Sequence, residues 1–177
     1  MTVYAFGEYT PEIAETAYIH PQASVIGDVK IGERVFVAPM ASIRGDRGRI
    51  EIGDESNIQD GAVIHSESGI VTWIGRRVNI GHNASIHSER IEDFGAVGMG
   101  AVLMVGSVVA EGALIANSAL LHPKTRTEPY SIYAGVPAKL MRKYGKDDSA
   151  RAVIDEYLDH YVEFALSYAK KLRRISD

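Results

Sequence analysis

The chain has 177 residues, of which 46% are hydrophobic, and its formal net charge is −4. A chain of this length and composition suits one domain with a continuous core. Because there is no basic excess to hold a nucleic-acid backbone or an anionic membrane, neither partner is expected. The sequence contains no cysteine, which excludes disulfides, thiolate nucleophiles and cysteine-ligated metals. Histidine, aspartate and glutamate are therefore the available metal ligands.

The first residues, MTVYAFGEYTPEIAE, carry acidic side chains and lack the basic and apolar segments of a secretory signal. Elsewhere in the chain, no apolar run is long enough to span a bilayer. We therefore expect a cytoplasmic protein.

From Ile19 onward, an aliphatic residue returns at every sixth position along most of the chain. The series is Ile19, Val25, Ile31, Val37, Ile43, Ile52, Ile58, Ile64, Ile74, Ile80, Ile86, Ile91, Val97, Leu103, Val109, Ile115 and Leu121. A small or β-branched residue often follows four places later, as at Ala23 and Val29. A period of six fits neither a helix nor a plain alternating strand. It suits short flat strands, three per coil, stacked on one core, so the repeat predicts an all-β fold of parallel coils.

Two interruptions of the repeat predict loops on one face of the coils, where insertions in repeat proteins often carry a binding site. Three extra residues fall between Ile43 and Ile52, around the segment GDRGR. Four more fall between Ile64 and Ile74, around SESGIVTW.

Three histidines, His65, His82 and His87, lie in this part of the repeat. Counting three strands per coil places His65 and His87 on the same side of adjacent coils, about 4.8 Å apart. The whole predicted column is Arg44, His65, His87, Met104 and His122. Two imidazoles at this spacing predict ligands of one metal ion. His82 falls on another side, below Asp60, so we expect that it does not reach that metal within the same subunit.

After the repeat, the sequence changes character. Residues 122–129 are rich in turn formers, and an amphipathic helix is expected from Asp147 to about Arg174, along the outside of the coils. The expected apolar stripe is Val153, Ile154, Tyr157, Leu158, Tyr161, Val162, Ala165, Tyr168 and Leu172. We expect residues 1–129 to form the repeat domain with its N-terminal lead-in. Residues 130–177 should form a crossing segment and a helix packed on that same domain.

Short motifs along the repeat resemble the gamma-class carbonic anhydrase family, in its shorter bacterial subclass. They are SIRGD (42–46), NIQD (57–60), VIH (63–65), IGH (80–82), SIH (85–87) and GMGA (98–101). The resemblance covers about residues 3 to 175. It implies a left-handed parallel β-helix with a C-terminal α-helix, assembled as a homotrimer. It also implies a metal ion at each subunit interface, held by His65 and His87 of one subunit and by His82 of its neighbour.

The implied reaction is the metal-dependent, reversible hydration of carbon dioxide to bicarbonate, which is a lyase activity. Zinc is the implied cofactor, with iron or cobalt as substitutes. By matching motifs, Gln59 hydrogen-bonds the metal-bound hydroxide and Asn57 stands behind it. Tyr133, in the segment YSIYAGVPAK, is a further candidate for lining the site.

Charged residues near the site both match the family and depart from it. Those that match a network of interfacial charges are Arg44, Asp46 and Asp60. Arg47 stands where the best-studied member has a glutamate, and the long acidic loop after the first ligand is reduced to residues 66–69. Because that loop supplies a proton shuttle, we expect low turnover, with protons leaving through buffer or through Glu67.

Two other functions remain open. A hexapeptide acyltransferase, or a related thioesterase, shares the β-helix and the trimer and uses one histidine as general base toward a coenzyme A thioester. That chemistry does not need three histidines on two adjacent coils. A metal- or siderophore-binding trimer with little turnover would keep the ligands and lose the reaction.

Overall fold

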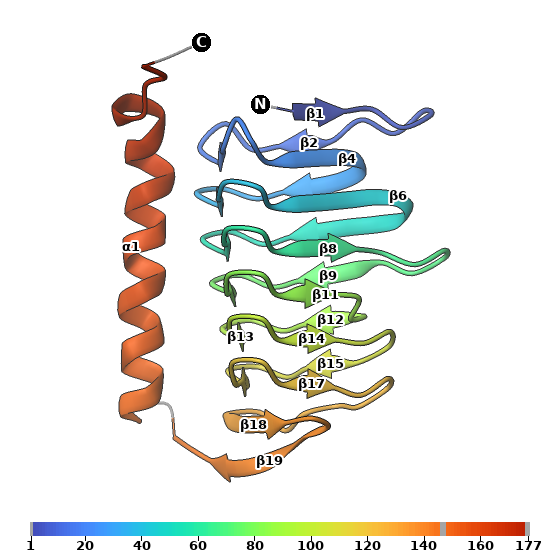
Figure 1. Ribbon diagram of the computed structural model, residues 1–177, viewed down its shortest axis with the longest axis vertical. Coiled ribbons are helices and arrows are strands. Elements are labelled where there is room, and N and C mark those ends of the chain that lie inside the picture. Colours follow the sequence, from blue (N-terminus) through green and yellow to red (C-terminus); the bar gives the residue numbers. More distant parts are fainter. Residues whose placement is uncertain (1, 146–147, 176–177) are drawn as a thin grey trace.

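The computed structural model describes residues 2–145 and 148–175 (Figure 1). The chain forms a left-handed parallel β-helix with one long helix, α1 (Ser149–Lys171), along its side, which confirms the predicted fold class. In the part of the chain that is described, none of the helical structure is long and apolar enough to cross a membrane.

Most strands have only two residues, because each coil needs a short flat segment between corners. In chain order they are β1 (Thr2–Tyr4), β2 (Glu12–Ile13), β3 (Tyr18–Ile19), β4 (Ser24–Ile31), β5 (Phe36–Val37), β6 (Ser42–Ile52), β7 (Asn57–Ile58), β8 (Val63–His65), β9 (Thr72–Ile74), β10 (Asn79–Ile80), β11 (Ser85–Ile86), β12 (Arg90–Ile91), β13 (Ala96–Val97), β14 (Val102–Leu103), β15 (Val108–Val109), β16 (Leu114–Ile115), β17 (Leu120–Leu121), β18 (Ser131–Gly135) and β19 (Ala138–Lys143).

Strands of successive coils pair in parallel and in register, so equivalent residues are stacked. Ile43 pairs with Ile64 and Ile64 with Ile86, and the same column continues to Leu103 and Leu121. One sheet runs in the order β15-β12-β9-β6-β8-β11-β14-β17, and the other runs β19-β18-β16-β13-β10-β7-β5-β3. The predicted stacking of the repeat is therefore confirmed.

The aliphatic residues of the repeat form one core inside the coils. All of them are buried, and Ile43, Ile64 and Ile86 are 0% exposed. Burying one such side chain contributes roughly 1.5–3 kcal/mol. The ladder is therefore the main source of stability, and it gives the side chains outside the coils a rigid support.

The corners of the coils use a left-handed backbone conformation. Met40, Asn83 and Ser118 have φ values of 60°, 57° and 56°, and Gly61 and Gly100 have 69° and 66° at equivalent corners. Each is followed directly by a buried alanine of the repeat. Because a larger side chain would not fit inside the corner, the alanine allows the same tight turn in coil after coil.

The insertion predicted around GDRGR is present, but it stays within a strand: β6 continues through this segment and bends around the corner together with β4 (Figure 1). Gly27 pairs with Gly45 and Val29 with Ile50, so the three extra residues form a bulge in β6 and not a loop outside the sheet. Glycine explains the difference. A Cβ on Gly27 would lie 2.5 Å from the Gly45 oxygen, and a Cβ on Gly45 would lie 2.4 Å from the Asp28 oxygen. Without those side chains, the two strands can approach each other closely at the bend and pair on both sides of it. The second interruption does leave the sheet, between β8 and β9.

The two ends of the stack differ from its middle. At the N-terminal end, β1 and β2 pair in parallel with β4. At the other end, β18 pairs in parallel with β16, and β19 then turns back and pairs antiparallel with β18. Figure 1 shows β19 leading from the end of the coils to α1.

The helix is shorter than predicted. It begins at Ser149, while Asp147 lies outside the described residues, and it ends at Lys171 instead of Arg174. Asp148 caps it by accepting a hydrogen bond of 2.9 Å from the Ala150 amide.

The apolar stripe predicted for the helix is too wide. Leu158 and Ala165 are buried, and Tyr161 and Tyr168 are partly buried against a cluster formed with Phe36. Members of the predicted stripe that are about half exposed are Val153 at 50%, Tyr157 at 57% and Leu172 at 47%. A helix that lies on a flat sheet touches it along a narrow line, so only part of the stripe is covered.

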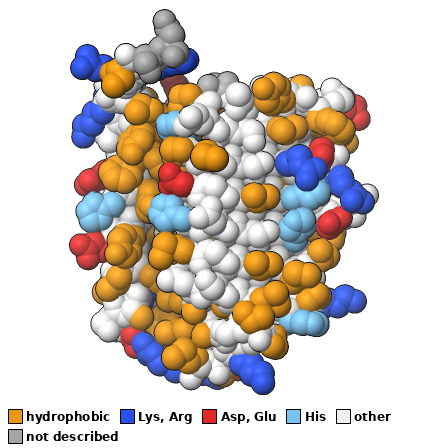
Figure 2. All heavy atoms as spheres, in the orientation of Figure 1, with side chains coloured by type: hydrophobic (Ala, Val, Ile, Leu, Met, Phe, Trp, Pro, Cys, Tyr) orange, Lys and Arg blue, Asp and Glu red, His pale blue; other side chains and the backbone are white. Residues whose placement is uncertain are grey.

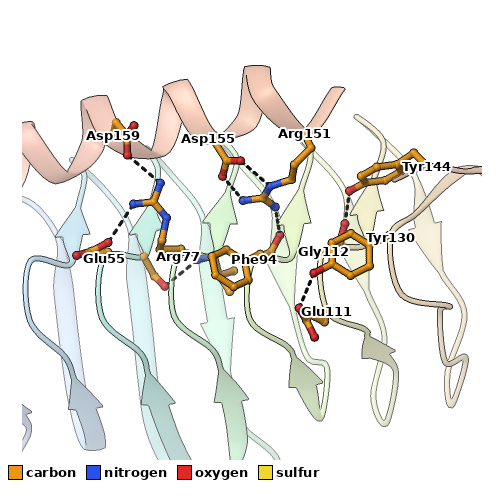
Figure 3. Close-up of polar contacts among 12 residues, drawn as sticks. Glu55, Arg77, Phe94, Glu111, Gly112, Tyr130, Tyr144, Arg151, Asp155 and Asp159 are labelled. Atoms are coloured by element: carbon orange, nitrogen blue, oxygen red, sulfur yellow. Dashed lines mark hydrogen bonds and ion pairs between the residues drawn. The ribbon is translucent and has the colours of Figure 1, made fainter. Parts of the chain in front are cut away.

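Two arginines hold one flank of the helix against the coils (Figure 3). Arg77 donates hydrogen bonds to Glu55 at 3.0 Å and to Asp159 of the helix at 2.8 Å. Arg151 is only 4% exposed, donates to the Phe94 carbonyl, and places its guanidinium carbon 5.3 Å from the centroid of the Phe94 ring. These contacts fix where the helix stands relative to the neighbouring sheet.

Candidate functional site

His65 and His87 lie side by side on the outside of the coils. His65 ends β8 and His87 follows β11, and their ring centroids are 5.4 Å apart with the ring planes at 85°. Arg44 pairs with His65 in the register of β6 and β8, so the predicted column is present. The core residues beneath these side chains are fully buried, which gives the two imidazoles a rigid base.

Each of the three histidines lies beside a carboxylate. The pairs are His65 Nε2 and Asp46 at 3.0 Å, His82 Nδ1 and Asp60 at 3.0 Å, and His87 Nδ1 and Glu67 at 3.7 Å. A carboxylate hydrogen-bonded to one ring nitrogen, as Asp46 is to His65, fixes the tautomer and the orientation of the ring. The other nitrogen is then prepared either to bind a metal or to take a proton.

Asp46 joins Arg44 to His65. Arg44 donates a hydrogen bond of 2.7 Å to one carboxylate oxygen, and His65 faces the other at 3.0 Å. Burial alone would raise the pKa of Asp46, but the hydrogen bonds from Arg44 and His65 outweigh burial and lower it below its usual value. Of the three residues predicted to form a charge network, the structure brings Arg44 and Asp46 together, while Asp60 lies at His82 instead.

Gln59 is held by two asparagines. Its Nε2 donates hydrogen bonds of 3.0 Å to Asn57 Oδ1 and 2.9 Å to Asn79 Oδ1, and its side chain is buried. Both N–H groups are therefore used, which leaves Oε1 to accept from a ligand. Sequence reasoning missed Asn79. The signal was its register, because Asn57 and Asn79 are stacked on adjacent coils.

His82 and Gln59 line a cleft of about 430 Å³ between the sheet and α1. The side chains that line it include Gln59, Asn79, His82, Met99, Tyr157 and Tyr161. Burial and the nearby Asp60 carboxylate raise the pKa of Tyr161, so its hydroxyl remains protonated at neutral pH. The cleft therefore offers hydrogen-bonding groups from amide, imidazole and phenol side chains, and none of its described lining residues is lysine or arginine.

Within one chain, His82 does not join the other two histidines. It follows β10 in one sheet, whereas His65 and His87 belong to the other. Among the described residues, the one group of three potential ligand atoms that lie within 4.8 Å of one another is His65, Glu67 and His87. Figure 2 shows histidine side chains gathered at two separate edges of one face. A site that contains all three histidines would have to be shared between subunits.

Glu67, the predicted substitute for the proton shuttle, lies between two charged or polar partners. Its carboxylate is 3.7 Å from His87 and 3.6 Å from the Arg47 guanidinium. Arg47 therefore contacts the carboxylate and does not stand alone in solvent. The arrangement keeps an acid beside the histidine pair, even though the loop is short.

Tyr133 lies away from the histidines. It stands on β18, pairs with Ile115, and is 8% exposed as part of the core. The strands β16 and β13 separate β18 from β10, which corresponds to about 14 Å at one strand spacing per coil. The structure thus does not bring Tyr133 to His82 or Gln59.

Comparisons with known proteins give the chain clear relatives, although no family model matches its sequence. The carnitine operon protein CaiE of Escherichia coli K12 is 36% identical over 148 residues, which span 84% of this chain and 76% of that protein. A solved hexapeptide transferase family protein from Anaplasma phagocytophilum is 30% identical, with a TM-score of 0.88 over 94% of this chain and 98% of that one. A Bacillus cereus protein provisionally assigned as an acetyltransferase is 28% identical, with a TM-score of 0.90 over 94% and 96% of the two chains.

Proposed function

Because the chain belongs to the hexapeptide-repeat family that includes the carnitine operon protein CaiE, we propose that it is a trimeric enzyme acting on acyl groups carried as coenzyme A thioesters. Two solved relatives at 28% and 30% identity are described as an acetyltransferase and a transferase, which supports an acyl-group reaction. The observation that carries the proposal is the His82–Asp60 pair at 3.0 Å, which lines a cleft beside Gln59.

His82 is the proposed general base. Asp60 lies at Nδ1 and fixes the ring, so Nε2 is the nitrogen that takes the proton of the attacking water, hydroxyl or amine. The nucleophile adds to the thioester carbonyl and the carbon–sulfur bond breaks. His82 then returns the proton to the departing thiolate, so one acyl bond replaces another with no net change in protons.

Gln59 is the proposed positioning residue for the nucleophile. Its amide nitrogen is committed to Asn57 and Asn79, so its oxygen is the group that can accept a hydrogen bond from the nucleophile. An amide does not titrate, so this contact persists at every pH at which the protein is folded. Binding the nucleophile at one orientation lowers the entropic part of the barrier.

Metal-dependent hydration of carbon dioxide is the second candidate, and the His65–His87 pair favours it. The residues fit a metal, because both rings carry a carboxylate partner and their ligand atoms lie with that of Glu67 in a group within 4.8 Å. In a homotrimer, His65 and His87 would hold the ion together with His82 of the partner subunit. Zinc, iron or cobalt bound there would make water nucleophilic at neutral pH. Glu67 is then the group beside His87 that can accept a proton and pass it to buffer.

One preparation tests both candidates. Protein purified without oxygen is analysed for metals, then assayed for thiol release from acyl thioesters and for carbon dioxide hydration, before and after treatment with a chelator. The first proposal expects thiol release that survives the chelator and is lost in His82→Ala. Exposed His160 supplies the matched control, His160→Ala, which should retain activity. Hydration that disappears with the metal, together with no release from any thioester, would overturn the first proposal in favour of the second.

A further inference from the structure

A second cleft of about 320 Å³ continues the first along α1. Both clefts are lined by Asn79, Val97, Gly98 and Asn117, so together they form one groove between the helix and the strands β10, β13 and β16. Figure 2 shows hydrophobic side chains gathered over α1 and along its border with the coils. We call the two clefts together the helix groove.

The helix groove changes from polar to apolar along its length. At one end stand His82 and Gln59, which the proposed reaction uses. At the other end the lining includes Leu114, Ala116 and Ile154, and none of the described residues that line the second cleft is ionisable. A phosphate or a carboxylate would find no cation in that part of the groove, whereas a hydrocarbon chain would lose its contact with water.

The outer wall of the groove is one stripe of α1. Ile154, Tyr157 and Tyr161 are three and four positions apart, so they lie on one face of the helix. The opposite flank of the helix is tied to the coils by Arg77 and Arg151 (Figure 3). This wall is therefore held at a fixed distance from the sheet and does not depend on a mobile loop.

The length of the groove follows from the coil spacing. From β10, which His82 follows, to β16, which carries Leu114, there are two strand steps, which correspond to about 10 Å. That distance separates the reactive end from the apolar end. An acyl chain extended along the stack would reach Ile154 while its carbonyl carbon stays beside His82.

We propose that the helix groove binds the acyl chain of the substrate, and that the preferred thioester carries an apolar acyl group of medium length. This inference rests on the proposed acyl-thioester reaction and adds the class of acyl group to it. The thioester carbonyl lies at His82, and the end of the chain contacts Leu114 and Ile154.

A chain-length series tests the proposal. Acetyl, butyryl, octanoyl and dodecanoyl thioesters of coenzyme A are compared by thiol release. Each buried methylene should raise kcat/KM by about fourfold until the groove is full. The matching S-ethyl and S-octyl thioethers, which cannot be cleaved, are compared by calorimetry, so that binding is measured without turnover.

Two variants change the apolar end in opposite directions. Ala116→Phe should lower the ratio of octanoyl to acetyl kcat/KM by more than tenfold, because the ring fills the second cleft. Ile154→Ala should shift the preference toward longer chains. Ala152→Phe makes the same change at an exposed position of α1 outside the groove and should leave the ratio unchanged.

The outcomes separate the groove from the reaction. If the thioethers bind more tightly with length but no thioester is cleaved, the groove assignment stands and the acyl-transfer proposal is wrong. If acetyl thioester is cleaved with no preference for length, and Ala116→Phe changes nothing, the groove assignment is wrong and the reaction stands. If no thioether binds and no thioester is cleaved, both are overturned.

Discussion

The imidazole of His82 and the carboxylate of Asp60 lie 3.0 Å apart on adjacent coils. The register of Ile58 with Ile80, two positions earlier on each strand, sets this spacing. The pair is therefore positioned by the β-helix itself and not by a flexible loop. Both side chains are partly exposed, at 41% and 53%, so a neighbouring subunit or a substrate can approach them.

Asp60→Asn should lower kcat for thioester cleavage about a hundredfold while KM changes little. An amide at this position no longer stabilises the imidazolium that forms when His82 takes a proton. Initial rates are measured over a range of thioester concentrations, because a role in proton transfer predicts that kcat falls while KM stays close to that of the parent. Asp54→Asn, at an exposed carboxylate that does not line the cleft of His82, is the control. A variant with normal kcat would remove Asp60 from the reaction.

Asn79→Leu should lower kcat/KM about threefold to tenfold, the range expected for the loss of one neutral hydrogen bond. Leucine cannot accept from Gln59, whose amide then loses one of its two anchors. Asn79→Asp keeps an oxygen acceptor and should restore most of the rate. If the aspartate and leucine variants are equally impaired, Asn79 does not act through Gln59.

Mixed trimers test whether the histidines of two subunits form one metal site. His65→Ala and His82→Ala each damage every site of a homotrimer. Refolded together in equal amounts, they should give mixed trimers in about three quarters of cases, each with one intact site in three. About a quarter of the parental metal binding should therefore return, as measured by metal analysis after gel filtration. Metal binding that stays at zero on mixing would place all ligands in one chain.

Arg151→Met should lower the free energy of unfolding by about 2 kcal/mol, even though it preserves most of the side-chain volume. The change leaves the partly buried Phe94 carbonyl without its donor and removes the ion pair with Asp155. The loss is measured by urea unfolding, and hydrogen exchange should show that α1 opens first. Arg173→Met, at an exposed position, is the control. Equal stabilities of the two variants would mean that the guanidinium does not hold the helix.

Helix docking should weaken in acid because of Asp148. Hydrogen bonds from Arg142 and from the Ala150 amide lower the pKa of Asp148 to about 2, below the value of about 3.9 for an unfolded chain. Its contribution to stability is therefore complete above about pH 4 and is lost as the pH falls toward 2. Asp148→Asn keeps a capping side chain but does not titrate. Circular dichroism between these pH values should show a smaller change for the variant than for the parent.

Much of the fold was predictable because one physical requirement repeats along the chain. Each coil needs an inward aliphatic residue and a small residue at the corner. The buried positions of Ile64, Ile86 and Ala84 could therefore be predicted from the six-residue period. Counting three strands per coil then predicted that Arg44, His65 and His87 form one column. The paired bend of β4 and β6 did not follow, because it depends on two glycines from different coils meeting, which no single stretch of sequence reveals.

The site was less predictable than the fold. The separation of His82 from His65, and its place below Asp60, followed from the period. The contact between the His82 and Asp60 side chains, in place of the expected network, depends on side-chain direction outside the coil. The helix groove depends on how α1 docks against the coils. That docking is set by Arg77 and Arg151, whose partners lie far away in the sequence.

The reversal at β19 covers an open edge at one end of the stack. A parallel stack that stopped at β18 would present a row of free amide and carbonyl groups, on which another stack could continue. β19 occupies that row by running the opposite way, and it carries Lys139, Arg142 and Lys143. The short antiparallel strand therefore covers the edge of β18 with a basic strand. Its loss would leave that edge open to pairing with another strand.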